Sequence, residues 1–285
     1  MIRHNISGMQ ARADPDTKRP GCVPNLKWRN MMNNKPGITL SLLYILTIFF
    51  SGIALADGQV TEIKAIPPMY SYIAVWNIPE DQWGVREDQA AAAKNILDRA
   101  IDKGTIVAYG YDGNPLHDTF WLAMSKAGLE SVRDQFEKIG ITPVPARAGA
   151  EVPPVSILIS RYYNWKTIRC ENAYVHVGIY KIKPDAPADA VDQLSKNFFG
   201  PVLEKMLADG VIFEWETDTY SDPKDSPGTF LIAYLSEKSE DLEKASKAVQ
   251  ERLKSNLPNG PALDSLIDMK AITDVLVRSY AVYKK

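Results

Sequence analysis

The stretches DKGTIVAYGYDG (Asp102–Gly113) and ADGVIFEWETD (Ala208–Asp218) make the same structural transition at two places in the chain. Each follows a segment with helical periodicity. Each carries an acidic residue just before a glycine, and then a run rich in β-branched and aromatic residues. A glycine of this kind is typical of a helix end, and such a run is typical of a strand. The sequence therefore predicts the same helix–glycine–strand step twice.

The segments around the two steps also correspond, in the same order along the chain. Each set is predicted as strand, helix, strand, strand, helix and strand, which is the split βαβ, ferredoxin-like arrangement. In the second set, Gly200-Pro201 is expected to kink or restart the first helix, because proline lacks the backbone N–H. The predicted outer strands are Tyr70–Asp81, Ser156–Lys166, Ala173–Asp185 and Asp274–Lys284.

One sheet face of each unit is left bare by its helices, and burying apolar surface stabilises by roughly 25 cal/mol per Å². The second unit is the nearest available cover. The pattern resembles the dimeric α/β-barrel superfamily, which includes the antibiotic-biosynthesis monooxygenases, the EthD-like and NIPSNAP proteins and the stress-responsive barrel proteins. The resemblance covers about Met69–Lys285 and rests on element order, on the steps at Gly104 and Gly210 and on aromatic fourth strands. No invariant motif singles out one of these families.

The resemblance implies an α+β fold in which two tandem ferredoxin-like βαββαβ repeats, 57–168 and 169–285, join their sheets into one barrel. In the superfamily the two units come from two chains. Here both units lie in one chain, so the barrel is expected to be intramolecular.

The N-terminal 56 residues are predicted to be separate from this fold. Ile38–Ala56 is apolar and uncharged, follows basic residues and ends in Ala54-Leu55-Ala56. This is typical of a signal peptide (31–56) cleaved after Ala56, and it predicts a secreted or periplasmic protein. A membrane anchor over 38–56 is the alternative. Residues 1–30 are interpreted either as a disordered extension or as a segment upstream of the true start.

Charge and cysteine content narrow the function classes. The chain holds 33 Lys and Arg and 35 Asp and Glu. Without residues 1–56, which hold seven basic and two acidic residues, 26 basic and 33 acidic residues remain, a formal net charge of −7. An acidic chain without a basic cluster is a poor nucleic-acid binder. Cys170 then stands alone, so no internal disulfide is expected.

Strand alternation sorts the predicted barrel residues by face. We assign Val175, Val177 and Ile179 to the helix side, with Ile73. Glu214 and Glu216 are assigned to the interior, opposite Phe213 and Trp215. Leu158, Ser160 and Tyr162 are placed on one face. The predicted cavity lining is Tyr72, Trp76, Tyr162, Tyr174, His176, Tyr180, Glu214, Arg278 and Tyr280.

The polar residues of this set have two interpretations each. His176 is a candidate general base or axial haem ligand, or a hydrogen-bonded structural histidine. Glu214 is a candidate partner for a ligand donor or for His176, or a solvated residue. Arg278 is a candidate clamp for a carboxylate, or a surface ion-pair residue.

Three functions remain open from the sequence. The first is a small-molecule-binding barrel with a small organic ligand. The second is a cofactor-independent monooxygenase-like enzyme with His176 as base, as the resemblance implies. The third is a structural or interaction module with a filled barrel. No nucleophile elbow, phosphate loop or zinc motif is present, so no cofactor or metal is expected. A homodimer is left open.

Overall fold

The computed structural model describes residues 63–75, 87–112, 118–141, 155–222, 224, 226–254 and 262–285, all of which belong to one compact unit, Leu55–Lys285. The predicted extension, the predicted signal peptide with its alternative anchor, and Trp76 lie outside the described residues. Among the helices that are described, none combines the length and apolarity needed to cross a membrane.

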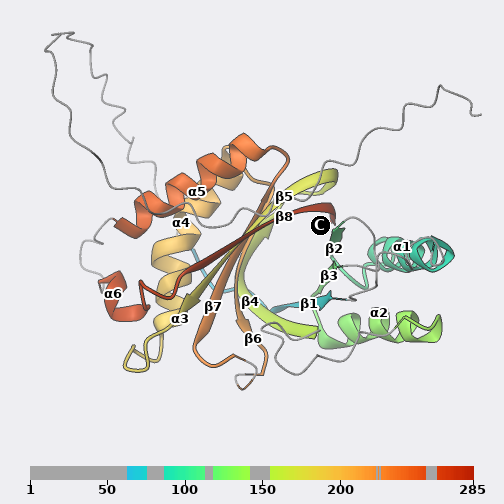
Figure 1. The fold of residues 1–285 in the computed structure, drawn as a ribbon, viewed down its shortest axis with the longest axis horizontal. Helices are drawn as coiled ribbons and strands as arrows, with labels where there is room; N and C mark the ends of the chain where they lie inside the picture. The colour runs from blue at the N-terminus through green and yellow to red at the C-terminus, as the bar shows by residue number, and fades with distance from the viewer. Residues whose placement is uncertain are drawn as a thin grey trace, which may run out of the picture. The chain divides into compact units, whose positions relative to one another are not determined.

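The described strands close into an antiparallel barrel (Figure 1). Their order around the barrel is β1-β3-β2-β8-β5-β7-β6-β4. The first half of the chain thus contributes β4-β1-β3-β2 and the second half contributes β8-β5-β7-β6, with junctions between β2 and β8 and between β4 and β6. The strands are β1 (Met69–Val75), β2 (Ala108–Asp112), β3 (Asp118–Ala123), β4 (Val155–Trp165), β5 (Ile168–Lys181), β6 (Glu214–Tyr220), β7 (Thr229–Ser236) and β8 (Thr273–Tyr283). The predicted α+β barrel is confirmed.

Helices cover the outside of the barrel wall. Figure 1 shows α1 and α2 side by side, and α3, α4, α5 and α6 on the other side of the strands. The helices are α1 (Glu87–Asp102), α2 (Lys126–Lys138), α3 (Ala190–Gln193), the π-helix η3 (Leu194–Phe199), α4 (Gly200–Ala208), α5 (Ser239–Lys254) and α6 (Leu263–Leu266).

Both predicted helix–glycine–strand steps are present. Gly104 follows α1 with a φ of 69°, and Gly210 follows α4 with a φ of 76°. Residues with a side chain rarely adopt this left-handed backbone conformation, whereas glycine adopts it at little cost. Each step therefore ends a helix and turns the chain into the next strand, β2 or β6.

The predicted break at Gly200-Pro201 takes the form of a change in helix type. The π-helix η3 ends at Phe199, and α4 begins at Gly200 with Pro201 in its first turn. A Cβ on Gly200 would lie 2.5 Å from the backbone oxygen of Ser195. Glycine is therefore required here, because the preceding turn approaches the backbone too closely for any side chain.

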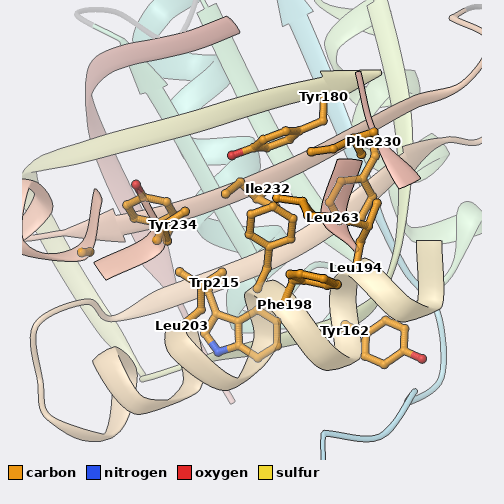
Figure 2. Close-up of a cluster of buried hydrophobic side chains, with 14 of the residues drawn as sticks. Tyr162, Tyr180, Leu194, Phe198, Leu203, Trp215, Phe230, Ile232, Tyr234 and Leu263 are labelled. Atoms are coloured by element: carbon orange, nitrogen blue, oxygen red, sulfur yellow. The ribbon is translucent and has the colours of Figure 1, made fainter. Parts of the chain in front are cut away.

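Buried side chains form one cluster inside the barrel and two between the barrel wall and the helices. The cluster beneath α1 and α2 includes Tyr72, Trp121 and Tyr280. The cluster beneath α3, η3, α4 and α5 includes Tyr162 and Tyr180 (Figure 2). The interior cluster includes Met69, Leu122, Trp165, Val175, Phe213, Leu235 and Tyr283.

The predicted strand faces are wrong for β1 and β5. Val175, Val177 and Ile73 line the barrel interior, whereas Tyr72 and Tyr180 pack beneath the helices. The physical reason is that both faces of these strands are buried, one by helices and one by the opposite barrel wall. Alternation then separates aliphatic from aromatic residues without saying which set points inward.

The prediction that Leu158, Ser160 and Tyr162 share one face of β4 is wrong, because β4 contains a β-bulge. The pairing of β4 with β6 shifts between Ser160 and Tyr162. A bulge inserts one extra residue, so side chains beyond it change face. Leu158 therefore lines the interior while Tyr162 belongs to the cluster beneath the helices, and the two do not share a face as predicted.

Candidate functional site

A cavity of about 240 Å³ lies inside the barrel. All eight strands contribute to its wall. At one end the cavity reaches the surface, because the lining residues Ile73 and Val277 are both 38% exposed. Most of the lining is apolar: Ile73, Phe120, Leu122, Leu158, Val175, Val177, Leu231, Ala233, Leu235 and Val277 line the wall, together with Ser71, Tyr111, Asp112, Asp118, Thr119, Glu216, Asp218, Arg278, Ser279 and Tyr283.

Three carboxyl groups lie in a row along β6. Glu214, Glu216 and Asp218 alternate with Trp215 and Thr217, so all three side chains share the interior face of the strand. They are 1%, 8% and 2% exposed. Glu216 and Asp218 line the cavity. Glu214 pairs in register with Trp165 and Leu235, two residues of the interior cluster. We call these three residues the acidic row.

Few hydrogen bonds support the acidic row. Ser71 Oγ on β1 donates to Glu216 Oε2 over 3.4 Å, which is a long bond. Within the described part of the chain, neither carboxyl oxygen of Glu214 nor Oδ1 of Asp218 has a hydrogen-bond partner. Buried polar atoms are normally paired, so these atoms have unused acceptor capacity inside the barrel.

Burial changes the protonation of the acidic row. It raises the pKa of Glu216 to about 7, an effect that the Ser71 hydrogen bond partly offsets. Burial, and then the neighbouring carboxylates, also raise the pKa of Glu214 and of Asp218 well above their ordinary range. Ionised carboxylates are poorly solvated in an apolar cavity, so each group is drawn toward its neutral form unless a cation accompanies it.

Arg278 does not supply that cation, although it lines the cavity. Its Nη2 donates to Asn172 Oδ1 over 2.8 Å, and its guanidinium lies over the Tyr174 ring, 5.5 Å from the centroid. The backbone of Arg278 is paired with that of Tyr174. The charged end of Arg278 is thus held by partners at the strand surface, away from the acidic row.

The five predicted site tyrosines do not line the cavity. Tyr72 stacks on Trp121, with ring centroids 4.2 Å apart beneath the α1–α2 layer. Tyr180 packs against Phe199, and Tyr174 lies at the edge of the same outer cluster. Tyr162 donates to Asp192 over 3.2 Å, and Tyr280 accepts a hydrogen bond from Arg169. The prediction that these tyrosines face the interior is therefore wrong.

His176 also lies on the outer face of β5, between the inward-facing Val175 and Val177. Its ring stacks on Tyr234 with centroids 4.6 Å apart, and its Nε2 lies 3.1 Å from Asp274 Oδ1. The hydrogen bond from His176 is the main cause that lowers the pKa of Asp274. His176 is only 7% exposed. Its predicted place in the barrel interior is wrong, and its contacts are those of a packed, hydrogen-bonded side chain.

The structure brings Glu214 to the interior, the face that the sequence assigned to it, and adds polar residues that sequence reasoning did not select. Among these are Asp218 and Ser71. A signal for Asp218 was available, because it continues the two-residue period of Glu214 and Glu216. Nothing in the sequence pointed to Ser71, because its role depends on the barrel closure that places β1 and β6 on either side of β4.

Comparisons with known proteins find solved structures that are partly similar in shape, but they identify no family. No family model matches the chain, and no curated protein matches it. Among solved structures, a protein of Lactobacillus acidophilus NCFM named provisionally as a monooxygenase is 14% identical, with a TM-score of 0.47 over 77% of this chain and 97% of its own. A protein of Fusobacterium nucleatum with the same provisional name is 8% identical, with a TM-score of 0.48 over 78% and 99%.

An anthrone oxidase-like protein is also similar, at 12% identity and a TM-score of 0.40 over 76% of this chain and 91% of its own. All three likenesses are distant in sequence and partial in shape. What the cavity does is therefore inferred from its own residues.

Proposed function

We propose that this chain is a small-molecule-binding α/β-barrel protein whose ligand occupies the barrel cavity. The observation that carries the proposal is an apolar cavity of about 240 Å³ that opens to solvent and contains buried carboxyl groups on one wall. Apolar walls with a few convergent polar groups are typical of small-molecule sites. An apolar cavity of roughly 150 Å³ accommodates benzene, so this one has room for an aromatic ring with a short polar chain.

A filled barrel, the structural or interaction alternative, is less well supported. A filled interior would pair its polar groups with one another. Instead, Asp218 lines open space with one oxygen unpaired among the described residues, and Ala233, the register partner of Glu216, adds only a methyl group to the lining. These features favour an occupant that the chain itself does not supply.

Filling the cavity should weaken binding without unfolding the protein. Ala233 lies in the middle of β7 and lines the cavity. We expect Ala233→Phe to place its ring in the empty space, to keep the melting temperature close to that of the unmodified chain, and to weaken binding of 2-phenylethanol by about tenfold or more. Saturation-transfer NMR with 2-phenylethanol measures this.

Ala91→Phe is the matched control, because Ala91 is exposed on α1. It introduces the same side chain outside the barrel and should leave the saturation-transfer signal unchanged. Equal binding by the unmodified chain and by Ala233→Phe would show that the ligand sits elsewhere and would refute the proposal.

An enzyme acting in the same cavity is a second candidate, and the pKa of Glu216 favours it. A general base works best with a pKa near the operating pH, and burial raises that of Glu216 to about 7. In such an enzyme the base would be Glu216 and not His176, which faces away from the cavity. Exchange of a bound ketone's α-protons in D₂O, abolished by Glu216→Gln and retained by His176→Gln, is the expected result. Retention in Glu216→Gln would exclude this role.

We further propose that 57–168 and 169–285 are tandem copies and that the chain is exported after cleavage behind Ala56. The equivalent strand orders β4-β1-β3-β2 and β8-β5-β7-β6 support the first statement. The apolar segment and its Ala54-Leu55-Ala56 end support the second. N-terminal sequencing of exported protein should begin at Asp57. A retained apolar segment would instead favour the anchor.

A further inference from the structure

The charges around the cavity are unbalanced. Its lining contains four acidic residues, Asp112, Asp118, Glu216 and Asp218, and one basic residue, Arg278. The guanidinium of Arg278 is held by Asn172 and Tyr174. Glu214 adds a further buried carboxyl group just beyond the lining. A ligand that complements this interior must bring positive charge or hydrogen-bond donors.

The carboxyl oxygens that a positively charged ligand would contact lie on one wall of the cavity, on β6. Asp218 is 2% exposed, lines the cavity, and has no partner for Oδ1 in the described parts of the chain. Glu216, two residues earlier on the same face, has among the described residues only the long bond from Ser71. Carboxylates accept hydrogen bonds and donate none. Two adjacent carboxylates in an apolar wall fit an ammonium group, which carries three donors and a full positive charge.

A metal ion fits this arrangement less well. The described residues hold no group of three or more His, Cys, Asp or Glu side chains placed to hold a metal ion. The acidic row runs along one strand, and the next two strands of the barrel supply aliphatic side chains to the lining, among them Leu231 of β7 and Val175 and Val177 of β5. Such walls suit the apolar part of an organic cation.

Resting on the proposed function, we propose that the ligand of the barrel cavity is an organic amine: an ammonium group held by Glu216 and Asp218, attached to an apolar group that packs against the apolar lining of the cavity. The two carboxylates supply charge-assisted hydrogen bonds in a site with little water, where such bonds are strongest. The apolar group packs against the aliphatic side chains that β5 and β7 present to the cavity, among them Val177 and Leu231. The exposed rim formed by Ile73 and Val277 is the route of entry.

Binding of an amine should be coupled to protons. An ammonium ion binds ionised carboxylates, so its affinity should increase as pH rises from about 5 to 8, while the affinity of a neutral analogue stays level. The other titratable groups that face Glu216 and Asp218 are Glu214 on β6, Tyr163 on β4 and Tyr283 on β8, with Asp112, Asp118, Tyr111 and Arg278 around the remaining lining. These groups are mostly acidic or phenolic, so they reinforce the preference for a cation.

The test uses three probes that share one skeleton: 2-phenylethylamine, 2-phenylethanol and 3-phenylpropionate. They are titrated into the full-length chain by calorimetry at about pH 8 and followed by NMR where binding is weak. We expect the amine to bind about ten- to a hundredfold more tightly than the alcohol, the range for a charge-assisted hydrogen bond. The carboxylate should not bind measurably.

The double variant Glu216→Gln/Asp218→Asn keeps the size of both side chains and removes both charges. It should lose the preference for the amine over the alcohol. The exposed pair Glu87→Gln/Asp88→Asn on α1 is the matched control and should keep that preference.

The outcomes separate the two proposals. Binding of the alcohol as tightly as the amine, or an amine preference that survives the double variant, overturns the inference while the cavity remains a binding site. Binding of none of the three probes overturns the inference together with the proposed function.

Discussion

Glu216→Gln should increase the free energy of unfolding of the ligand-free protein at alkaline pH. Burial raises the pKa of Glu216 from 4.5 to about 7. A shift of this size corresponds to roughly 3 kcal/mol once the side chain is ionised. Because the folded-state pKa is above the unfolded one, the contribution of Glu216 to stability is fully present below about pH 4.5. It is lost as pH rises through about 7.

Urea unfolding at about pH 4.5 and pH 8 measures this effect. The unmodified chain should lose stability between the two conditions, and Glu216→Gln should lose less, so that the variant is the more stable protein at pH 8. Glu130→Gln is the control, because Glu130 is exposed on α2. If Glu216→Gln is the less stable protein at pH 8, the carboxyl group is paired in the folded chain and the acidic row is misassigned.

Trp121→Ala should destabilise the protein strongly and leave cavity binding intact. Trp121 is fully buried on the outer face of β3. It stacks on Tyr72, meets the edge of Phe136 with ring centroids 5.5 Å apart, and donates its indole N–H to the oxygen of Leu129 over 3.2 Å. Removing a buried tryptophan costs about 3–5 kcal/mol.

The neighbouring residue provides the matched variant. Phe120 lies on the opposite face of the same strand, lines the cavity and is half-buried. Phe120→Ala should cost less stability than Trp121→Ala and should alter the affinity for 2-phenylethanol. Thermal melting and saturation-transfer NMR on both variants measure this. If instead Trp121→Ala changes the affinity and Phe120→Ala does not, Trp121 faces the cavity and the assignment of the two faces of β3 is wrong.

The order of elements could be predicted from the sequence because it depends on local signals. Gly104 and Gly210 end helices through their own backbone conformation, which neighbouring residues alone determine. The buried stripe of α1, including Ile96, Leu97 and Ile101, follows from helical spacing. Closure into a barrel followed from the apolar sheet faces that the helices leave uncovered.

The direction in which each strand faces could not be predicted in the same way. In β5, Val175 and Val177 alternate with Tyr174 and His176, and both sets are at least partly buried. Hydrophobicity ranks the two sets almost equally, so the choice depends on what lies opposite each face. The bulge after Ser160 then reverses the alternation within β4, and no residue type in the sequence indicates the bulge.

The candidate site was partly visible in the sequence. The spacing of Glu214 and Glu216 placed both on one face of a strand. Their significance depends on a long-range fact, namely that the barrel buries that face and brings Ser71 of β1 opposite Glu216. The aromatic residues were predicted to line the cavity because rings with polar tips are typical of binding sites. In this barrel those rings serve to attach the helices to the outer wall.

The central claim, that the ligand lies inside the barrel and not beneath the helices, is tested most directly by methyl NMR of the full-length chain with 2-phenylethylamine. Val175 and Val177 line the cavity, whereas Ile232 and Val249 belong to the cluster beneath α3, η3, α4 and α5. We expect nuclear Overhauser effects between the phenyl ring and the methyl groups of Val175 and Val177, and none to those of Ile232 and Val249. Contacts to Ile232 and Val249 alone would place the ligand on the outer face and contradict the account.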